Sequence, residues 1–418
     1  MTKGRLIRLA AAATAVVAIA ACSSSNKSGS GSAAGNNKSN GSPITVGLLT
    51  TLTGPAAAQF LGNLPGAQAR IDLQNAQGGV NGHQIKLISA DDQTSVTGAN
   101  TAMSDLIQSK GAFAVIDLSD FTAGGAYRVA QRAGVPVVGF PSDGPEWGQK
   151  PNTNMISIEG NVPSTGIGGE VNTLYPKVAK MLGATNMADL ALAGEPASDQ
   201  GAQSFAKAAK SIGLKIGYTN YSIPIGTVDV TPAVLAMKQA HVDGFESGLL
   251  DNTNLALMTT ARQAGLHFVA PLLAAGFSQD LLDQPASNQA AQGGVYDLFQ
   301  RPVNTPNAAT RTEQAAFAKY EHYTGVPSLG WTAGWVSADL LIQGLKGAGA
   351  NPSHTSVLNT LHNLKGYTAD GLLPGPIDLS LANFGKPPKT LCNYFAQLKG
   401  HQFVTLNGGK PICGTNVS

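Results

Sequence analysis

Charged side chains are scarce in this chain of 418 residues, of which 12% are Asp, Glu, Lys or Arg. An average soluble protein has about twice that share. The 27 basic and 25 acidic residues nearly cancel, so the chain lacks the strongly basic surface that binds nucleic acids or anionic membranes. Apolar residues make up 43% of the sequence. That share predicts a globular protein with a sizeable core rather than a disordered one.

Motifs of the common catalytic and cofactor-binding sites are also missing. The sequence has no Walker A run, no G-x-G-x-x-G that opens a helix and no H-E-x-x-H, and the part expected to fold has no G-x-S-x-G. The seven histidines do not have the spacing of metal ligands: they are His83, His241, His267, His322, His354, His362 and His401. We therefore expect no cofactor, no metal site and no enzymatic activity. A secreted hydrolase, with Ser, His and Asp converging only in the folded chain, stays open as an alternative.

The first 21 residues have the pattern of an export signal. Lys3, Arg5 and Arg8 precede an apolar run of small residues from Leu9 to Ala21. That run is too short and too poorly flanked for a lasting transmembrane helix. We therefore predict that residues 1–21 are a signal peptide. The next residue, Cys22, is one of three cysteines, and an ordinary signal with an incidental cysteine is the simpler alternative.

The sequence Ile19-Ala20-Ala21-Cys22 resembles the lipobox of bacterial lipoproteins. This resemblance implies cleavage before Cys22 and acylation of that cysteine, and two or more acyl chains anchor a protein stably in a membrane. Residues 23–42 contain only two apolar side chains and are expected to form a flexible tether reaching roughly 25 Å. Residues 22–42 would thus hold the protein on the outer face of the cell membrane.

The two remaining cysteines, Cys392 and Cys413, lie near the C-terminus. In an exported chain such a pair predicts a disulfide. The loop of about 20 residues that it closes corresponds to a stabilisation of about 3 kcal/mol in the chain-entropy model. Two buried free thiols are the alternative.

Short apolar runs alternate with longer helical patterns along the rest of the chain. Such strands, buried on both faces and separated by helices, predict an α/β fold with mostly parallel sheets. The first unit is expected to contain strands 44–49, 84–90, 113–116 and 135–139 and helices 54–77, 96–109 and 123–133. The second is expected to contain helices 162–182, 200–212, 231–239 and 253–264 and strands 188–193, 215–221, 244–249, 268–273 and 294–299. Helices 308–323, 331–346 and 353–364 are expected to cover the first sheet.

Several spaced motifs resemble one family of transport proteins. They are Ile44-Thr45-Val46-Gly47, Leu52-Thr53-Gly54-Pro55, the run Asn75–Gly82, Asp91-Asp92 and the run Ala261–Leu266. Together they resemble the type I extracytoplasmic substrate-binding proteins of ABC importers, the leucine/isoleucine/valine-binding group, over about residues 44–380. The resemblance implies two α/β lobes that close about a hinge on a small molecule, and a monomer that delivers this molecule to a membrane permease. Delivery of a signal to a membrane sensor is the alternative.

We place the lobe boundaries from the strand pattern together with this resemblance. Lobe 1 is expected to comprise residues 43–158 and 301–376. Lobe 2 is expected to comprise residues 159–300 and 377–418. A chain of nearly 380 residues after the tether exceeds what one compact core usually serves, which favours this division.

The resemblance also implies ligand-binding residues at the carboxyl ends of strands, where open α/β sheets bind ligands. In lobe 1 these are Phe60, Ser119, Asp120, Phe121, Thr122, Ser142 and Asp143. In lobe 2 they are Glu195, Ser198, Leu250, Asp251 and Phe277. The hydroxyls of lobe 1 fall where amino-acid binders hold the ligand carboxylate. The three Phe side chains have core packing as an alternative role, and Asp143, Asp199 and Asp251 have helix capping; Glu195 directly follows a predicted strand, so capping is not expected for it.

Asp143 and three positions of lobe 2 depart from the pattern of amino-acid binders. Asp143 would place a second anion next to a ligand carboxylate, which is unfavourable. Ser198, Leu250 and Ala275 stand where those binders place two aromatic rings and an acid against the ligand ammonium group, and Leu250 and Ala275 cannot stabilise a cation. We therefore expect a ligand other than a simple branched-chain α-amino acid. An amide, a polyamine-like molecule or an aromatic compound with a polar head fits the candidate residues.

Overall fold

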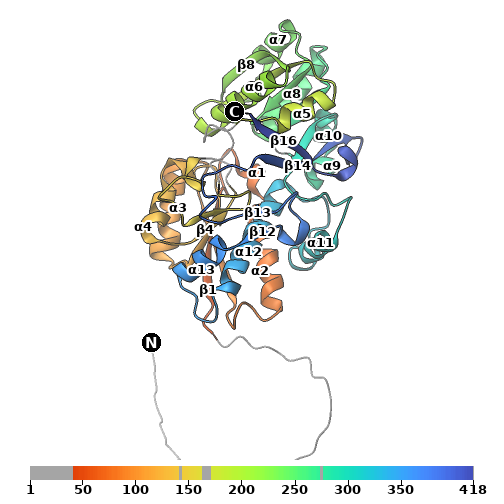
Figure 1. The fold of residues 1–418 in the computed structure, drawn as a ribbon. Helices are drawn as coiled ribbons and strands as arrows, with labels where there is room; N and C mark the ends of the chain where they lie inside the picture. The colour runs from red at the N-terminus through yellow and green to blue at the C-terminus, as the bar shows by residue number, and fades with distance from the viewer. Residues whose placement is uncertain (1–40, 141–143, 162–170, 274–275, 418) are drawn as a thin grey trace, which may run out of the picture. The chain divides into compact units, whose positions relative to one another are not determined.

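The computed structural model describes residues 41–140, 144–161, 171–273 and 276–417. Cys22 and all but the last two residues of the tether 22–42 lie outside these ranges, so signal peptide, lipidation and tether stay predictions. Across the described ranges, no helix has the length and apolar content needed to cross a bilayer. The described residues belong to one compact unit that contains two large sheets (Figure 1).

The first sheet has five strands, all parallel, in the order β2-β1-β3-β4-β5. They are β1 (Ile44–Thr50), β2 (Ile85–Asp91), β3 (Ala114–Leu118), β4 (Val137–Gly139) and β5 (Met155–Ser157). Every residue of β3 and β4 is buried, because helices cover both faces of the sheet. The prediction of an α/β fold is confirmed. The sequence pattern does not predict β5, since three residues are too few to show a periodicity.

Helices from distant parts of the chain cover the two faces of this sheet. One face packs against α3 (Val96–Ser104) and α4 (Ala126–Ala133). The other face packs against α2 (Asn63–Ala76), α11 (Ala308–Tyr320), α12 (Leu329–Gly347) and α13 (His354–His362). The prediction that the three helices after residue 308 cover the first sheet is confirmed.

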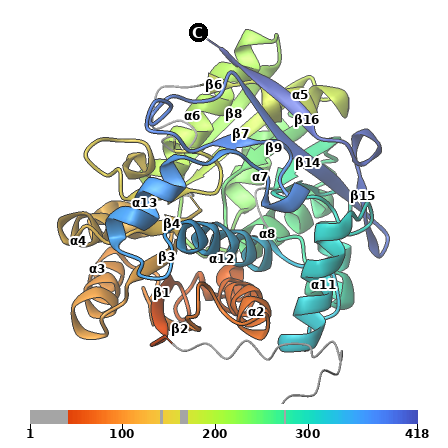
Figure 2. The ribbon, with the colours of Figure 1, turned by 60° about the horizontal axis from the view of Figure 1, so that its bottom comes forward.

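The predicted helix 54–77 is wrong as a single element. The chain forms a short helix α1 (Ala57–Phe60) and then α2, with Leu61 and Gly62 between them. The close contact between α2 and α12 lies directly after this break (Figure 2). A Cβ on Gly66 would lie 2.2 Å from the backbone O of Trp331, and one on Gly334 would lie 2.3 Å from the backbone O of Asn63. The two backbones touch because both positions lack a side chain.

The second sheet has nine strands and is mixed. Its path is β6-β16-β14-β11-β10-β9-β7-β8, and β15 pairs with β14. The parallel part contains β7 (Asn186–Leu192), β8 (Lys215–Ile223), β9 (Gly244–Ser247), β10 (Ala270–Leu273) and β11 (Val295–Leu298). The antiparallel part contains β6 (Val171–Asn172), β14 (Thr390–Lys399), β15 (Gln402–Thr405) and β16 (Ile412–Val417). The sequence pattern predicts the parallel part and misses the antiparallel one.

Helices cover both faces of the second sheet as well. One face packs against α5 (Leu174–Met181) and α6 (Pro196–Ser211). The other packs against α7 (Thr231–Gln239), α8 (Asp251–Gln263), α9 (Gln279–Asp283) and α10 (Pro285–Ala291). The predicted helix 162–182 is wrong in its middle, because β6 precedes α5; its first nine residues lie outside the described ranges. A separate two-stranded sheet joins β12 (Lys365–Tyr367) to β13 (Ile377–Asp378).

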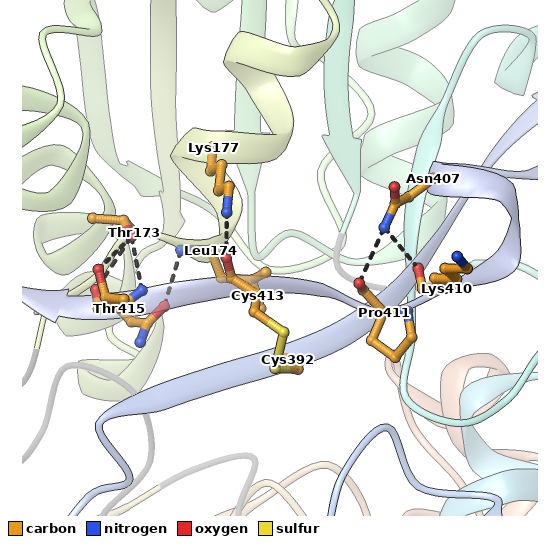
Figure 3. The surroundings of a disulfide bond; sticks show 10 residues. Thr173, Leu174, Lys177, Cys392, Asn407, Lys410, Pro411, Cys413 and Thr415 are labelled. Carbon is orange, nitrogen blue, oxygen red and sulfur yellow. Dashed lines mark hydrogen bonds between the residues drawn. A yellow bond between two sulfur atoms is a disulfide. The ribbon is translucent and has the colours of Figure 1, made fainter.

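Cys392 and Cys413 form a disulfide between directly paired residues of β14 and β16 (Figure 3). The predicted disulfide is therefore confirmed. Strand β16 also contacts α5, because Lys177 Nζ donates to the backbone O of Cys413 at 2.8 Å. The backbone N–H of Thr415 donates to Thr173 Oγ1 at 2.9 Å. The C-terminal strand is thus fastened to β14 by a covalent bond and to α5 by hydrogen bonds.

The contact between α2 and α12 yields a test of the fold. We expect Gly66→Ala to lower the free energy of unfolding by about 1–3 kcal/mol, because the added methyl group meets a backbone oxygen that cannot rotate away. Helix propensity alone would make alanine more stable than glycine by about 0.5–1 kcal/mol. A decrease in the free energy of unfolding would therefore point to the steric clash. Urea unfolding followed by circular dichroism measures the effect.

Gly375→Ala is the matched control. Within the described structure a Cβ at Gly375 meets no atom within 4 Å, so we expect a change within about 0.5 kcal/mol. A Gly66→Ala protein as stable as the wild type would show that the two helices do not depend on this close approach.

Candidate ligand-binding site

The carboxyl ends of β1, β2 and β3 are joined by hydrogen bonds to one buried acid, Asp92. Its Oδ2 accepts from Thr51 Oγ1 at 2.8 Å and from Ser119 Oγ at 2.5 Å. Its Oδ1 accepts from the backbone N–H of Thr94 at 2.8 Å. Asp92 is completely buried. The loops that follow the three strands are therefore fixed relative to one another at the edge where a ligand is expected.

Asp117, at the end of β3, holds the other side of the predicted loop 119–122. Its Oδ1 accepts from Thr122 Oγ1 at 3.0 Å and from the backbone N–H of Ser119 at 3.2 Å. Its Oδ2 is buried and has no hydrogen-bond partner among the described residues. Burial raises the pKa of Asp117 to about 7. The loop is thus built on two buried acids.

These bonds determine what the two hydroxyls can offer to a ligand. A hydroxyl has one proton to donate and two lone pairs to accept with. Ser119 donates its proton to Asp92 and accepts from the backbone N–H of Phe121 at 3.1 Å, while Thr122 donates to Asp117. Both side chains are buried. With these bonds in place, the loop has no hydroxyl proton left for a ligand carboxylate.

The other predicted residues of this edge lie as follows. Phe60 ends α1 and is 8% exposed. Asp120 is half-buried in the turn after β3. Phe121 is half-buried and packs against the core beneath α3 and α4. Ser142 and Asp143 lie outside the described residues.

Another buried acid, Glu146, lies near Asp117. Glu146, which precedes the buried Trp147, is 1% exposed. In the part of the chain that the structure describes, neither of its carboxylate oxygens has a hydrogen-bond partner. Burial, together with the nearby charge of Asp117, raises the pKa of Glu146 to about 8. This pair cannot be recognised in the sequence, because the two acids lie 29 positions apart and neither belongs to a motif.

At the edge of the second sheet, Glu195 caps a helix. Its carboxylate accepts from the backbone N–H of Ser198, in the first turn of α6, as side chains at helix N-termini do. Ser198 Oγ in turn accepts from the backbone N–H of Leu192 at 3.0 Å, at the end of β7. The expectation that capping does not involve Glu195 is wrong. The helix begins at Pro196, four residues earlier than the pattern predicts, and this makes Glu195 the preceding residue.

Phe60 and Leu250 pack together, one from the strand-end edge of each large sheet. Together with Ala56 they form a separate small apolar cluster, with Phe60 and Ala56 from the α1 region and Leu250 from the residue before α8. The structure therefore brings together one predicted residue from each sheet. Each of these three side chains is less than 9% exposed.

Asp251 follows Leu250 as the first residue of α8. Its Oδ1 is buried and, within the described ranges, lacks a hydrogen-bond partner. Burial raises the pKa of Asp251 to about 6. A Cβ on Gly276 would lie 3.1 Å from this oxygen. Asp251 thus has an unsatisfied carboxylate oxygen in the segment after β9, one residue after Leu250.

Phe277 lies inside the core of the second sheet. It is 4% exposed, and its ring centroid lies 6.4 Å from that of Tyr296 and 6.3 Å from that of Phe403. Ala275 lies outside the described residues. Core packing therefore accounts for Phe277.

A hydrogen-bonded bridge joins α9 to the loop before α12, and no sequence motif marks it. The backbone N–H of Gln279 donates to the O of Val326 at 2.9 Å, and the N–H of Val326 donates to Gln279 Oε1 at 3.2 Å. Tyr323 Oη donates to the same carbonyl at 2.6 Å. Val326 also packs against the core of the second sheet. The bridge links a segment between two helices of the first sheet to a helix of the second.

Metal binding finds no support in this region. In residues 41–140, 144–161, 171–273 and 276–417, no three His, Cys, Asp or Glu side chains are grouped so that they could hold a metal ion.

Comparisons with known proteins place the chain among binding proteins of this architecture. A family model described as periplasmic binding protein matches residues 43–402. No curated protein matches the chain with significance.

Solved structures share the fold at low sequence identity. A solute-binding protein of an ABC transporter from R. palustris, in complex with benzoate, is 19% identical with a TM-score of 0.70, over 88% of this chain and 97% of that one. The branched-chain amino acid binding protein LivJ from Streptococcus pneumoniae, in complex with isoleucine, is 18% identical with a TM-score of 0.67, over 89% and 99%. A branched-chain amino acid ABC transporter protein from Thermus thermophilus with bound valine is 16% identical with a TM-score of 0.72, over 88% and 96%.

The buried acids predict that stability falls as the pH rises. Asp117 and Glu146 titrate near 3.8 and 4.5 in an unfolded chain and near about 7 and about 8 in the folded protein. Between these values the folded state binds more protons, so the free energy of unfolding decreases from about pH 5 to about pH 8. We expect Glu146→Gln, which stays neutral, to flatten this dependence and to raise the melting temperature at pH 8.5 by about 2–4 °C.

Melting curves at pH 5 to 9 measure this effect. Asp105→Asn is the control, because Asp105 is exposed and paired with Lys110 at 2.8 Å on the surface; its curve should keep the wild-type pH dependence. A Glu146→Gln curve parallel to that of the wild type would rule out a raised pKa at Glu146.

Proposed function

The chain belongs to the family of periplasmic binding proteins, and from this membership we propose that it is the solute-binding receptor of an ABC importer. Members of this family bind small molecules outside the cytoplasm. The observation that carries the proposal is the meeting of two strand-end edges at the Phe60–Leu250 cluster. Each edge lies at the carboxyl ends of parallel strands, where α/β sheets bind ligands.

We propose two lobes, residues 43–158 with 301–376 and residues 159–300 with 377–418, that close on the ligand about a hinge. The distribution of the strands supports these boundaries. All strands of the first sheet lie within residues 44–157, and those of the second lie within 171–298 and 390–417. The bridge between Gln279 and Val326 would then be a contact between lobes. Such a contact contributes to the balance between open and closed forms.

The proposed ligand is a small polar or amino-acid-like molecule other than a simple branched-chain α-amino acid. Solved structures of similar fold hold benzoate, isoleucine or valine, so the architecture suits small organic molecules. In this chain the hydroxyl protons of Ser119 and Thr122 already point to buried acids. Leu250 belongs to an apolar cluster and offers no charge to an ammonium group. The protein would act as a monomer and release its ligand unchanged to a permease, without cofactor or catalysis.

Capture of a co-purified molecule tests this function. We expect native mass spectrometry of the freshly purified protein to show a bound small molecule, which liquid chromatography recovers chemically unchanged. After removal of this molecule by unfolding and refolding, adding it back should shrink the radius of gyration in small-angle scattering, because the lobes close. A chemically altered ligand would indicate an enzyme instead. If no bound molecule is found and no metabolite of a broad panel causes compaction, the receptor proposal is refuted.

We further propose that Cys22 carries the lipid anchor. We expect the wild-type protein to sediment with membranes and to incorporate a labelled fatty acid. Cys22→Ser should remove both properties and release the protein to the soluble fraction, because the acyl chains supply the membrane affinity. The Cys392→Ser variant is the control and should stay membrane-bound. Persistent labelling of Cys22→Ser would place the anchor elsewhere.

A further inference from the structure

Building on the proposed receptor function, we propose that the ligand is an organic cation without a carboxylate group, and that Asp251 holds its positively charged group. Three independent features of the described residues support this class of ligand. They are the charges at the strand ends, the direction of the loop hydroxyls and the unsatisfied oxygen of Asp251.

The segments that follow β1, β2, β3, β7, β8, β9, β10 and β11 contain more acidic than basic residues. They comprise residues 51–56, 91–95, 119–125, 193–199, 224–230, 248–251, 276–278 and 299–301. Their acids are Asp91, Asp92, Asp120, Glu195, Asp199, Asp229 and Asp251, and their one basic residue is Arg301. A region lined by one sign of charge concentrates ions of the opposite sign. It therefore attracts cations and repels carboxylates.

Arg301 is oriented by contacts within the chain. Its Nε donates to the backbone O of Gly371 at 3.3 Å. Its guanidinium carbon lies 5.5 Å from the ring centroid of Tyr394. The one arginine at these edges is thus engaged with the chain itself.

The loop 119–122 presents hydrogen-bond acceptors. Ser119 and Thr122 donate their only hydroxyl protons to Asp92 and Asp117. Oxygens that remain free to accept match the N–H groups of an amine and do not match a carboxylate. This arrangement has the opposite polarity to a carboxylate-binding loop.

Asp251 supplies the specific anchor. An acid in the first helical turn ordinarily accepts from backbone N–H groups, but Oδ1 of Asp251 is buried without such a partner in the described structure. Leaving a buried carboxylate oxygen unpaired is costly, and a cation or charged N–H donor offsets that cost. At Gly276 a Cβ would lie 3.1 Å from this oxygen, so a residue with a side chain would crowd it. Leu250, the residue before Asp251, packs with Phe60 in an apolar cluster, which would take the hydrocarbon part of the ligand.

Pairs of probes that differ in a carboxylate test the proposal. Isoamylamine and leucine, phenethylamine and phenylalanine, putrescine and ornithine, and choline and glycine betaine are compared by isothermal titration calorimetry and thermal shift. We expect at least one member of the cation series to bind, and its carboxylated counterpart to bind at least about tenfold more weakly. Asp251→Asn should weaken binding of that cation by about tenfold or more, since it removes a charge-assisted bond.

Two controls separate loss of binding from loss of folding. Asp105→Asn removes one exposed acid of the ion pair with Lys110 and should leave the affinity unchanged. Asp251→Asn without ligand should melt at or above the wild-type temperature, because it removes an unpaired buried charge. Binding of the carboxylated probes alone, of no probe at all, or of a cation with equal affinity for wild type and Asp251→Asn would overturn the inference. A co-purified neutral or anionic molecule would also overturn it, while the receptor function would stand.

Discussion

The backbone contact between α2 and α12 is the constraint that positions α1 and Phe60 at the strand ends of the first sheet. Gly66 and Gly334 let the two helices approach so closely that neither position accommodates a Cβ. At the same contact, Asn63 Nδ2 donates to Thr50 Oγ1 at 2.8 Å and to the backbone O of Leu118 at 3.2 Å. The start of α2 is therefore held at the ends of β1 and β3. Because α1 and Phe60 directly precede α2, their position follows from that of Asn63.

Buried acids give the strand ends their second common feature. Asp92 and Asp117 position the loop after β3, and among the described residues neither has a basic side chain as a hydrogen-bond partner. Such an arrangement orients hydroxyl groups strongly, because each carboxylate accepts the protons that the loop would otherwise offer to a ligand. It also leaves part of the carboxylates unsatisfied, as at Asp117 Oδ2. The same carboxylates that position the loop therefore make its stability depend on their protonation.

Much of the fold could be predicted from the sequence, and the successes share a physical cause. Strands such as β3 are buried on both faces, so their continuous apolar runs are visible without any knowledge of partners. Strand β14 is buried only in its middle, and β6 has two residues, so neither gives such a run. The break between α1 and α2 also escapes the pattern, because it reflects the close approach of α12, which lies more than 250 positions later.

The candidate site divides in the same way. The family resemblance places Phe60 and Leu250 at the site, and the structure packs these two side chains together. The role of Ser119 could not be predicted, since the direction of its hydroxyl proton depends on Asp92, 27 positions earlier. The capping role of Glu195 depends on where α6 begins, and helix boundaries are the least certain part of any pattern. Asp251 could be placed, but its missing partner is a property of the packed structure alone.

The pairing of β16 with β6 affects how this protein folds during synthesis. Val417 pairs with Val171, and the disulfide links β16 to β14, so residues far apart in the chain complete the second sheet. Strands separated by more than 240 positions must find one another, which slows assembly. A chain synthesised from its N-terminus can therefore complete this sheet only after β16 has been made, and until then the edge of β6 stays open to wrong partners.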